Sequence, residues 1–293
     1  MNQVHLQITS PPTKDTVIRQ LGPVRAALSN FLGIGLGYVY VGRIELAFAF
    51  VATLIGITAI AGWSRLIFHP LGLYALAAVT TLATVFVVTH SGLIAARNRT
   101  AIARPYTRWW FYILWIVLSL FLSQWLLSSR SVLFGFEPFR IPSSSMAPAV
   151  QKGDFVMADT WYFDRTDPQY GDLIVFRVPG DTDVKFLKRI VGLPGDKIEI
   201  RDDVLIRNGQ PINEPYIQLT DQGPERSRNF EPAIMSDENY FVLGDNRHRA
   251  KDSRYIGPID QSLLHGRVVH RWFAYRDSVL WDRFPEMLDN NRE

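Results

Sequence analysis

The sequence predicts N-terminal transmembrane α-helices followed by a mainly-β domain. Long uncharged apolar stretches lie within residues 1–134, which we expect to form a membrane anchor. Short runs of Val, Ile, Phe and Tyr, separated by Gly-Asp pairs, occupy residues 135–293. A strongly basic connection between two of the apolar stretches indicates on which side of the membrane the second half lies.

Three stretches of the first half are long and apolar enough to cross a bilayer: 46–63, 71–95 and 109–128. The last begins with Trp109 and Trp110, an aromatic pair typical of the membrane interface. A buried helix of a soluble protein is the alternative for any one stretch, but three in succession disfavour it. The segment 26–41 is shorter and contains three glycines, so we expect an interfacial or re-entrant segment and leave a fourth crossing open.

The connection between the second and third stretches is the most basic short loop, and its arginines are Arg97, Arg99, Arg104 and Arg108. The positive-inside rule places this loop in the cytoplasm. The third stretch then runs outward, and the second half of the chain lies outside.

Four runs in the second half are typical of strands: 154–158, 172–178, 184–191 and 239–243. Gly-Asp pairs between them predict turns. Residues 220–237 are polar and contain two prolines, so we expect an inserted loop or a small subdomain there.

Composition excludes several kinds of chemistry. The chain has no cysteine, so it forms no disulfide, uses no thiolate and lacks the common structural zinc patterns. Its acidic residues show no convincing metal-ligand spacing, and we expect no cofactor. A net charge of +3 does not favour nucleic acid as a partner.

A serine cluster, Ser143 to Ser145, follows the last apolar stretch. A serine hydroxyl is a weak nucleophile and needs a base, either histidine or a lysine kept neutral by burial. Lys185 and Lys188 lie in an apolar run, and their odd spacing points them to opposite faces of a strand. One could therefore point inward as a neutral base. In the alternative, both lysines lie in water on an edge strand.

Four motifs resemble the conserved boxes of type I signal peptidases, also called leader peptidases. They are, in order, PSSSMAP (142–148), GDFV (153–156), KRIVGLPGD (188–196), and GDNR (244–247) followed by DSR (252–254). Each motif alone is weak evidence, but the ordered set after membrane spans is specific. The family pattern does not account for the first hundred residues.

The resemblance implies a mainly-β catalytic domain of the signal-peptidase type and a Ser/Lys dyad. Ser145, directly before the methionine, would be the nucleophile, and Lys188, which opens the Lys-Arg pair, would be the general base. Ser143 would stabilise the oxyanion together with the backbone N–H of Ser145. Asp252 and Arg254 match a structural ion pair of the family.

The resemblance also implies the substrate: the signal peptide of an exported preprotein, cut after an Ala-x-Ala site. The residues that match the family's substrate groove are Phe139, Ile141, Pro142, Phe186 and Leu187. The implied location is the bacterial cytoplasmic (inner) membrane, with the catalytic domain on the outer, periplasmic face. The lipid bilayer is the second expected partner, and contact with the secretion machinery is left open.

One position departs from the family pattern. Many members have a serine two residues before the Asp-Ser-Arg motif, where its hydroxyl orients the lysine, but this chain has Ala250. Since alanine has no side-chain hydrogen-bonding group, we expect a water or another hydroxyl to replace it.

Three other interpretations remain. A Ser145/His248/Asp252 triad is conceivable from the residue types. A self-cleaving repressor-type peptidase also uses a serine and a lysine, but three membrane spans argue against this class. A catalytically weak or inactive signal-peptidase-like membrane protein, acting as a binding platform, would account for Ala250.

Overall fold

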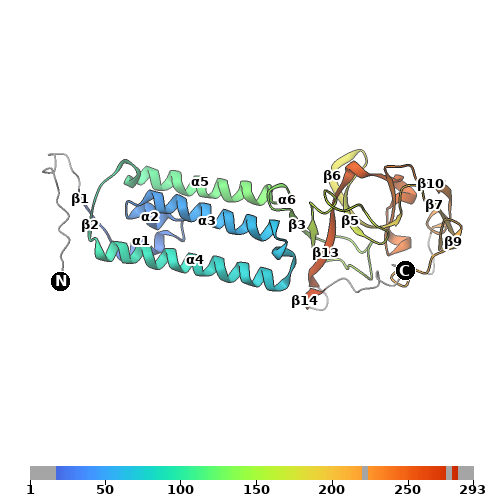
Figure 1. Cartoon of the computed structure of the whole chain (residues 1–293), viewed down its shortest axis with the longest axis horizontal. Coiled ribbons are helices and arrows are strands. Elements are labelled where there is room, and N and C mark those ends of the chain that lie inside the picture. Colours follow the sequence, from blue (N-terminus) through green and yellow to red (C-terminus); the bar gives the residue numbers. More distant parts are fainter. Residues whose placement is uncertain (1–17, 220–223, 275–278, 283–293) are drawn as a thin grey trace. The chain divides into compact units, whose positions relative to one another are not determined.

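The computed structural model describes residues 18–219, 224–274 and 279–282. The chain divides into two compact units (Figure 1), a helical one that ends at Ser129 and a β-rich one formed mainly by the residues from Arg130 onward.

Three helices of the helical unit are long and apolar enough to cross a membrane: α3 (Ile44–Trp63), α4 (Pro70–Arg97) and α5 (Trp109–Ser128). Many of their large apolar side chains are exposed, among them Leu82, Phe86, Leu120 and Phe121. Such surfaces are unfavourable in water and compatible with lipid. A two-stranded sheet of β1 (Ile18–Gln20) and β2 (Thr100–Ile102) adjoins these helices.

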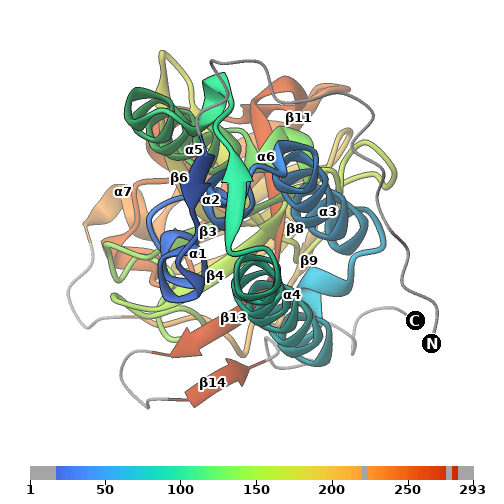
Figure 2. The same ribbon diagram turned by 90° about the vertical axis from the view of Figure 1, so that its left-hand side faces the viewer.

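The apolar segment 26–41 does not form one continuous helix. It contributes to two short helices, α1 (Pro23–Ser29) and α2 (Leu36–Tyr40), and α2 packs against α3 and α5 (Figure 2). Asn30 joins the two, because its Nδ2 donates to Ala26 O at 3.1 Å and its Oδ1 accepts from Gly37 N at 3.0 Å. A Cβ at Gly37 would collide with the Asn30 and Ser91 side chains, so this close approach requires glycine.

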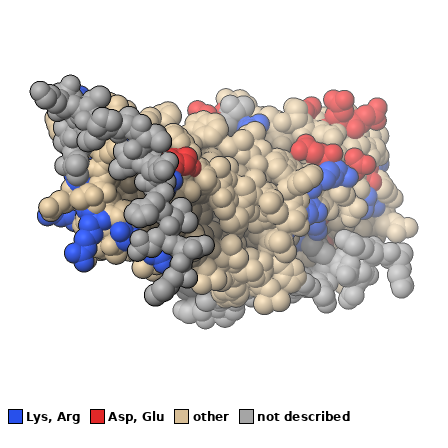
Figure 3. Space-filling model, turned by 60° about the vertical axis from the view of Figure 1, so that its left-hand side comes forward, with Lys and Arg blue, Asp and Glu red and all other residues tan. Residues whose placement is uncertain are grey.

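Basic residues gather at one end of the helical unit, where Figure 3 shows Lys and Arg in blue beside largely uncharged helix sides. The residues that connect α4 to α5 contribute Arg99, Arg104 and Arg108 to this end. The arrangement fits the orientation expected from the positive-inside rule.

The second unit is mainly β, as predicted. Its large sheet has the strand order β12-β11-β6-β5-β13-β4-β3, with β14 paired to β13. The strands are β3 (Phe136–Arg140), β4 (Phe155–Asp159), β5 (Leu173–Val178), β6 (Asp181–Gly192), β11 (Asn239–Leu243), β12 (Ile259–Asp260), β13 (Leu264–Ala274) and β14 (Val279–Asp282). The four predicted strand runs correspond to β4, β5, β6 and β11.

A smaller sheet has the order β10-β7-β8-β9. Its strands are β7 (Lys197–Arg201), β8 (Val204–Arg207), β9 (Gln210–Pro211) and β10 (Phe230–Ile234). The polar segment 220–237 therefore supplies β10 and α7 (Glu225–Arg228), while residues 220–223 lie outside the described chain. Two further short helices are α6 (Arg130–Leu133) and α8 (Ser253–Ile256).

Both faces of the large sheet are covered by apolar cores. Along β5, Leu173 and Val175 belong to one cluster, while Ile174 and Phe176 belong to another. This alternation is the two-residue period of a strand, and it explains why the strand reads as a continuous apolar run. The first cluster also contains Met146 and Val150 and so supports the loop that carries the serine cluster.

Strand β6 changes partners along its length. Its residues from Asp181 to Arg189 pair with β5, but β11 pairs only with the portion from Arg189 to Gly192. Among the described strands, the second edge of β6 before Arg189 has no partner. The terminal strand β3 likewise pairs only with β4.

Candidate active site

The serine cluster lies in the loop that follows β3 and is fixed by the segment after β11. Asn246 N donates to Ser145 O at 3.1 Å, and Asn246 Nδ2 donates to Ser144 O at 3.2 Å. Met146 anchors the loop because its side chain is only 1% exposed in the core. A Cβ on Gly244 would lie 2.6 Å from Ser145 O, so this close approach also requires glycine.

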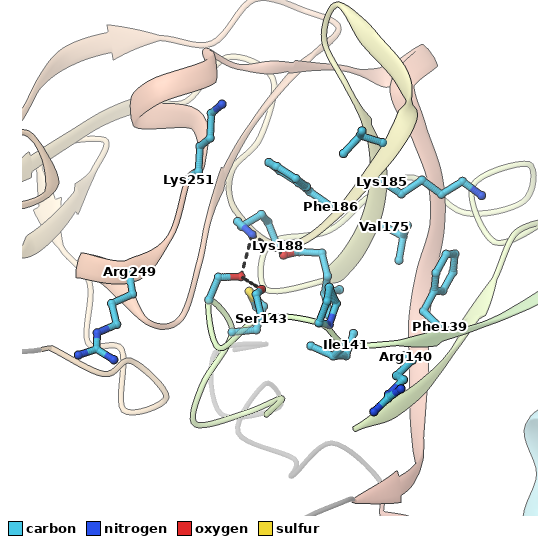
Figure 4. Close-up of a pocket in the computed structure, with 15 residues that line it drawn as sticks. Phe139, Arg140, Ile141, Ser143, Val175, Lys185, Phe186, Lys188, Arg249 and Lys251 are labelled. Atoms are coloured by element: carbon cyan, nitrogen blue, oxygen red, sulfur yellow. Dashed lines mark hydrogen bonds between the residues drawn. The ribbon is translucent and has the colours of Figure 1, made fainter. Parts of the chain in front are cut away.

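Lys188 on β6 reaches this loop from the opposite side (Figure 4). Its Nζ lies 3.1 Å from Ser145 Oγ and 2.8 Å from Leu187 O. The residue is 3% exposed, so the edge-strand alternative with both lysines in water is wrong for Lys188. Burial lowers the pKa of Lys188 to about 8, against the opposing carboxylates of Asp252 and Asp245.

Ser143 lies beside the same hydroxyl. Its Oγ is 3.2 Å from Ser145 Oγ, and its side chain is exposed to the groove. The three polar groups of Ser143, Ser145 and Lys188 therefore converge at one point. A water-accessible hydroxyl, a buried amine and a second hydroxyl are the groups that acyl transfer requires.

A groove of about 490 Å³ leads away from this point. Its lining includes all five residues that the sequence assigned to the substrate groove: Phe139, Ile141, Pro142, Phe186 and Leu187. Phe139 comes from β3, whereas Phe186 and Leu187 come from β6. The two strands with unpaired edges thus both contribute to the groove.

Asp252 and Arg254 form a buried pair that holds the segment 244–254. Arg254 Nε and Nη2 donate to the two carboxylate oxygens of Asp252 at 2.8 and 2.7 Å. The same carboxylate accepts from Gly244 N at 3.1 Å, and Arg254 Nη2 also donates to Arg247 O at 2.6 Å. The pair therefore fixes the backbone that contacts the serine loop.

His248 occupies a different environment from the one a triad would need. Its Nε2 lies 2.8 Å from Asp203 Oδ1. Asp252 is engaged with Arg254 and Gly244, and Ser145 Oγ contacts Lys188 and Ser143. The structure thus brings Ser145 to Lys188 and not into a Ser145/His248/Asp252 chain.

Ala250 is buried, and its side chain offers no hydrogen bond to Lys188. The lysine has a different acceptor in the structure, a backbone carbonyl. The expected water or hydroxyl stays a prediction; among the described residues, Lys188 Nζ donates to Leu187 O at 2.8 Å and lies 3.1 Å from Ser145 Oγ. This carbonyl belongs to the adjacent residue on β6. A backbone acceptor of this kind has no signature in side-chain identity.

Sequence reasoning missed several charged groups of the site. Lys185 Nζ donates to Glu137 Oε1 and Oε2, both at 3.0 Å, and lies 3.0 Å from His265 Nε2. Two buried arginines have carboxylate partners, Arg189 with Asp245 and Arg247 with Glu214. Arg249 and Lys251 line the groove. The basic composition of 247–254 was visible, but the pairing of Arg247 with Glu214, 33 residues away, was not.

Among the described residues, no group of three or more His, Asp or Glu side chains is placed to hold a metal ion.

Comparison with known proteins gives consistent matches. The family described as "Signal peptidase, peptidase S26" matches residues 109–273, more than half of the 293 residues. A probable signal peptidase I-1 of Synechocystis sp. is 34% identical over 147 residues, which cover 48% of this chain and 72% of that protein. Signal peptidase I of Bacillus licheniformis is 33% identical over 153 residues, 49% of this chain and 80% of the relative.

A longer match extends toward the helices. Signal peptidase I of Pseudomonas fluorescens is 30% identical over 232 residues, 66% of this chain and 78% of the relative. A signal peptidase I from Enterococcus faecalis, known from a crystal structure, is 33% identical in sequence to this chain. The match covers 35% of this chain and 97% of that chain. The TM-score is 0.31, which supports no argument about the fold. From the family match over more than half of its length, the chain belongs to the signal peptidase family, peptidase S26.

Proposed function

We propose that this protein is a membrane-bound serine endopeptidase that removes signal peptides from exported preproteins with a Ser145–Lys188 dyad. The observation that carries the proposal is the 3.1 Å contact between Ser145 Oγ and the buried Lys188 Nζ. A lysine with a pKa of about 8 is partly neutral near physiological pH, so it can accept a proton from the hydroxyl.

In the first step, Lys188 Nζ takes the proton of Ser145 Oγ as the oxygen attacks the scissile carbonyl carbon. The oxyanion of the tetrahedral intermediate accepts hydrogen bonds from the Ser145 backbone N–H and the Ser143 hydroxyl. When the intermediate collapses, the Lys188 ammonium gives its proton to the leaving amine. The products are an acyl-enzyme on Ser145 and the free N-terminus of the mature protein.

Deacylation repeats these steps with water as the nucleophile. Lys188, again neutral, accepts a proton from water, and the same donors stabilise the second oxyanion. Expulsion of Ser145 Oγ, which regains its proton from Lys188, releases the signal peptide with a free carboxylate.

The groove supports recognition of an extended peptide. The unpaired edges of β3 and of β6 before Arg189 offer backbone groups for β-augmentation. Ile141, Leu187 and Phe186 present apolar surface near the dyad, which suits small residues of an Ala-x-Ala site. Specificity would then come from the limited space beside these side chains.

The apolar helices support anchoring in the bacterial cytoplasmic membrane. We propose that α3, α4 and α5 cross the bilayer, that the basic α4–α5 connection is cytoplasmic, and that the β-rich unit is periplasmic. A catalytic unit on the outer face would meet signal peptides as they emerge from the membrane.

The test is cleavage of a preprotein with an Ala-x-Ala site by the detergent-solubilised chain. Wild type should cut, Ser145→Ala and Lys188→Ala should be inactive, and His248→Ala should retain activity. Active Lys188→Ala together with inactive His248→Ala would replace the dyad by the triad. A wild type that binds the signal peptide without cutting it would favour the binding platform.

A further inference from the structure

The groove has an ionic end that the dyad chemistry does not use. Lys185 Nζ lies 3.0 Å from each carboxylate oxygen of Glu137 and 3.0 Å from His265 Nε2, and His265 Nε2 also contacts Glu137 Oε2. The three side chains come from β6, β3 and β13, although β6 and β3 are separated in the large sheet by β5, β13 and β4. The cluster therefore joins the two strands whose edges border the groove.

This cluster lies at the end of the groove away from the dyad. Lys185 and Phe139 both line the groove, and Lys185 Nζ is 5.3 Å from the centre of the Phe139 ring. The His265 ring meets the same phenyl ring edge-on, with 6.2 Å between the ring centres. Figure 4 shows the Lys185 side chain directed away from Lys188 and Ser143.

The lining of the groove thus changes from apolar to ionic along its length. Ile141 and Leu187 provide the apolar lining near the dyad. At the far end, the side chains of Lys185, Glu137 and His265 are 26%, 17% and 10% exposed, so water still reaches them. An apolar side chain placed over this end would remove that water without replacing its hydrogen bonds.

The carboxylate of this cluster carries a charge at neutral pH. Burial alone would raise the pKa of Glu137, but hydrogen bonds and charges from His265 and Lys185 lower it to about 2. Loss of water from a charged group costs more than loss of water from a neutral one. The far end should therefore discriminate against apolar groups.

The spacing along β6 indicates which peptide residue meets the ionic end. Lys185 precedes Lys188 by three residues, which is about 10 Å along a strand. A peptide extended along β6 covers this distance in about three residues. If the scissile carbonyl lies at Ser145 Oγ, beside Lys188 Nζ, the fourth or fifth residue before the cut lies beside Lys185.

We propose that Lys185, Glu137 and His265 form a subsite that favours a polar side chain, an amide or a hydroxyl, at the fourth or fifth position before the cut and disfavours an apolar one. The inference rests on the proposed peptidase function and adds a preference beyond the Ala-x-Ala residues. An amide or hydroxyl can form hydrogen bonds with the cluster in place of water. In a signal peptide, this subsite would mark the point by which the apolar segment has to end.

The experiment compares peptides that share one Ala-x-Ala site and differ only by Asn or Leu, two side chains of similar size. One pair carries the exchange at the fourth position before the cut, and a second pair carries it at the fifth. With wild type in detergent, kcat/KM should be about threefold to tenfold higher for the Asn peptide in at least one pair.

Removal of the ion pair should abolish this preference. Glu137→Leu combined with Lys185→Met replaces the pair by apolar side chains and should bring the Asn/Leu ratio to one or below. Lys185→Arg should keep the wild-type ratio, because it keeps a cation and its donors. The matched control is Glu199→Leu combined with Arg201→Met, the same kind of exchange at an ion pair on β7, which should leave the ratio unchanged.

The ratio is measured within one protein preparation, so partial unfolding of a variant does not change it. If the double variant at Glu137 and Lys185 does not fold, Lys185→Met alone decides, with an expected ratio below about half that of wild type. Equal rates for the Asn and Leu peptides in wild type would overturn this inference and leave the peptidase proposal standing. The same holds if the preference persists without the ion pair, whereas failure of wild type to cut any peptide would overturn both proposals.

Discussion

Two lysines on β6 line the same groove, three residues apart, in opposite electrostatic settings. Lys185 contacts the Glu137 carboxylate on β3 and His265 on β13. Lys188 contacts a hydroxyl and a carbonyl, both uncharged, and is 3% exposed. The first ties β6 to β3 through its carboxylate partner, whereas burial lowers the pKa of the second to about 8.

The pKa of Glu137, the carboxylate partner of Lys185, also reflects these contacts. Burial alone would raise the pKa of Glu137, but hydrogen bonds and charges from His265 and Lys185 lower it to about 2. Burial lowers the pKa of the Lys188 amine to about 8, although the charges of Asp252 and Asp245 oppose the shift. In the described structure, no carboxylate forms a hydrogen bond with its Nζ. Charged partners, more than position on the strand, decide whether a lysine of this groove is structural or basic.

The largest expected effect comes from replacing each lysine by methionine. Lys188→Met should reduce kcat/KM at least about a thousandfold, because the general base is lost. It should also raise the free energy of unfolding by ~1–3 kcal/mol at pH 7, since a buried ammonium is removed. Lys185→Met should lower stability by ~1–2 kcal/mol and reduce activity far less.

Peptide cleavage and thermal unfolding in detergent measure both quantities for each variant. The proposed difference between the two lysines would be contradicted if Lys185→Met and Lys188→Met lose activity equally, or if Lys188→Met is the less stable of the two.

The pH dependence of activity should follow the titration of Lys188 at its lowered pKa of about 8, and not that of an ordinary lysine at 10.5. Activity should rise about tenfold per pH unit up to pH 8 and then level, so that kcat/KM at pH 6 is about a hundredth of the plateau. The measurement is a pH–rate profile with wild type, and Lys185→Met should keep the same acid limb. A flat profile between pH 6 and 8 would contradict the assignment of Lys188 as base.

The same pKa also predicts how stability changes with pH. Because the folded pKa of Lys188 lies below the ordinary value of 10.5, the unfolded chain binds this proton more tightly. The destabilisation is fully present below pH 8 and disappears as pH rises through 10.5. The stability gained by Lys188→Met should therefore shrink between pH 8 and 10.5; an unchanged gain would contradict this linkage.

A smaller effect is expected from Glu137→Gln. The amide leaves Lys185 and His265 without their carboxylate, which should cost about 1–2 kcal/mol of stability above pH 4. The sign follows from the lowered pKa of Glu137: its contribution is present above the unfolded value near 4.5 and lost as pH falls toward 2. Urea or thermal unfolding at pH 7 and pH 3 tests this, and equal losses at both values would refute it.

The smallest effect should come from Ala250→Ser. Lys188 Nζ already has Leu187 O and Ser145 Oγ as partners, so the added hydroxyl should change kcat/KM by less than about threefold. A gain above tenfold would mean that orientation of Lys188 limits the enzyme. Ala250→Gly is the control for altered packing without a hydroxyl.

Much of the architecture was accessible from the sequence because it depends on local pattern. The apolar stretches predicted α3, α4 and α5, and β-branched and aromatic runs predicted β4, β5, β6 and β11. The spacing of Lys185 and Lys188 allowed one of them to be buried but left open that both lie in water, and the choice of Lys188 came from the family resemblance.

The remaining features depend on contacts between distant segments. Glu137 and His265 lie 48 and 80 residues from Lys185, and no local pattern pairs them. The break in segment 26–41 depends on Asn30 meeting Gly37 and Ser91, a contact that also involves α4. The sequence also does not reveal that Arg249 and Lys251 form no ion pair with any described residue, because this depends on which carboxylates the fold brings near them.

The contact between the serine loop and the segment after β11 has a consequence for biosynthesis. Asn246 and Ser144 are 102 residues apart, and Gly244 must pass against Ser145 O for the loop to take its position. A growing chain therefore has its serine loop long before it has the backbone that positions this loop. If Ser145 is the nucleophile, as proposed, hydrolytic activity can arise only after the segment around Gly244 and Asn246 has been made and has folded against the serine loop, so a chain that ends before this segment is not yet a protease.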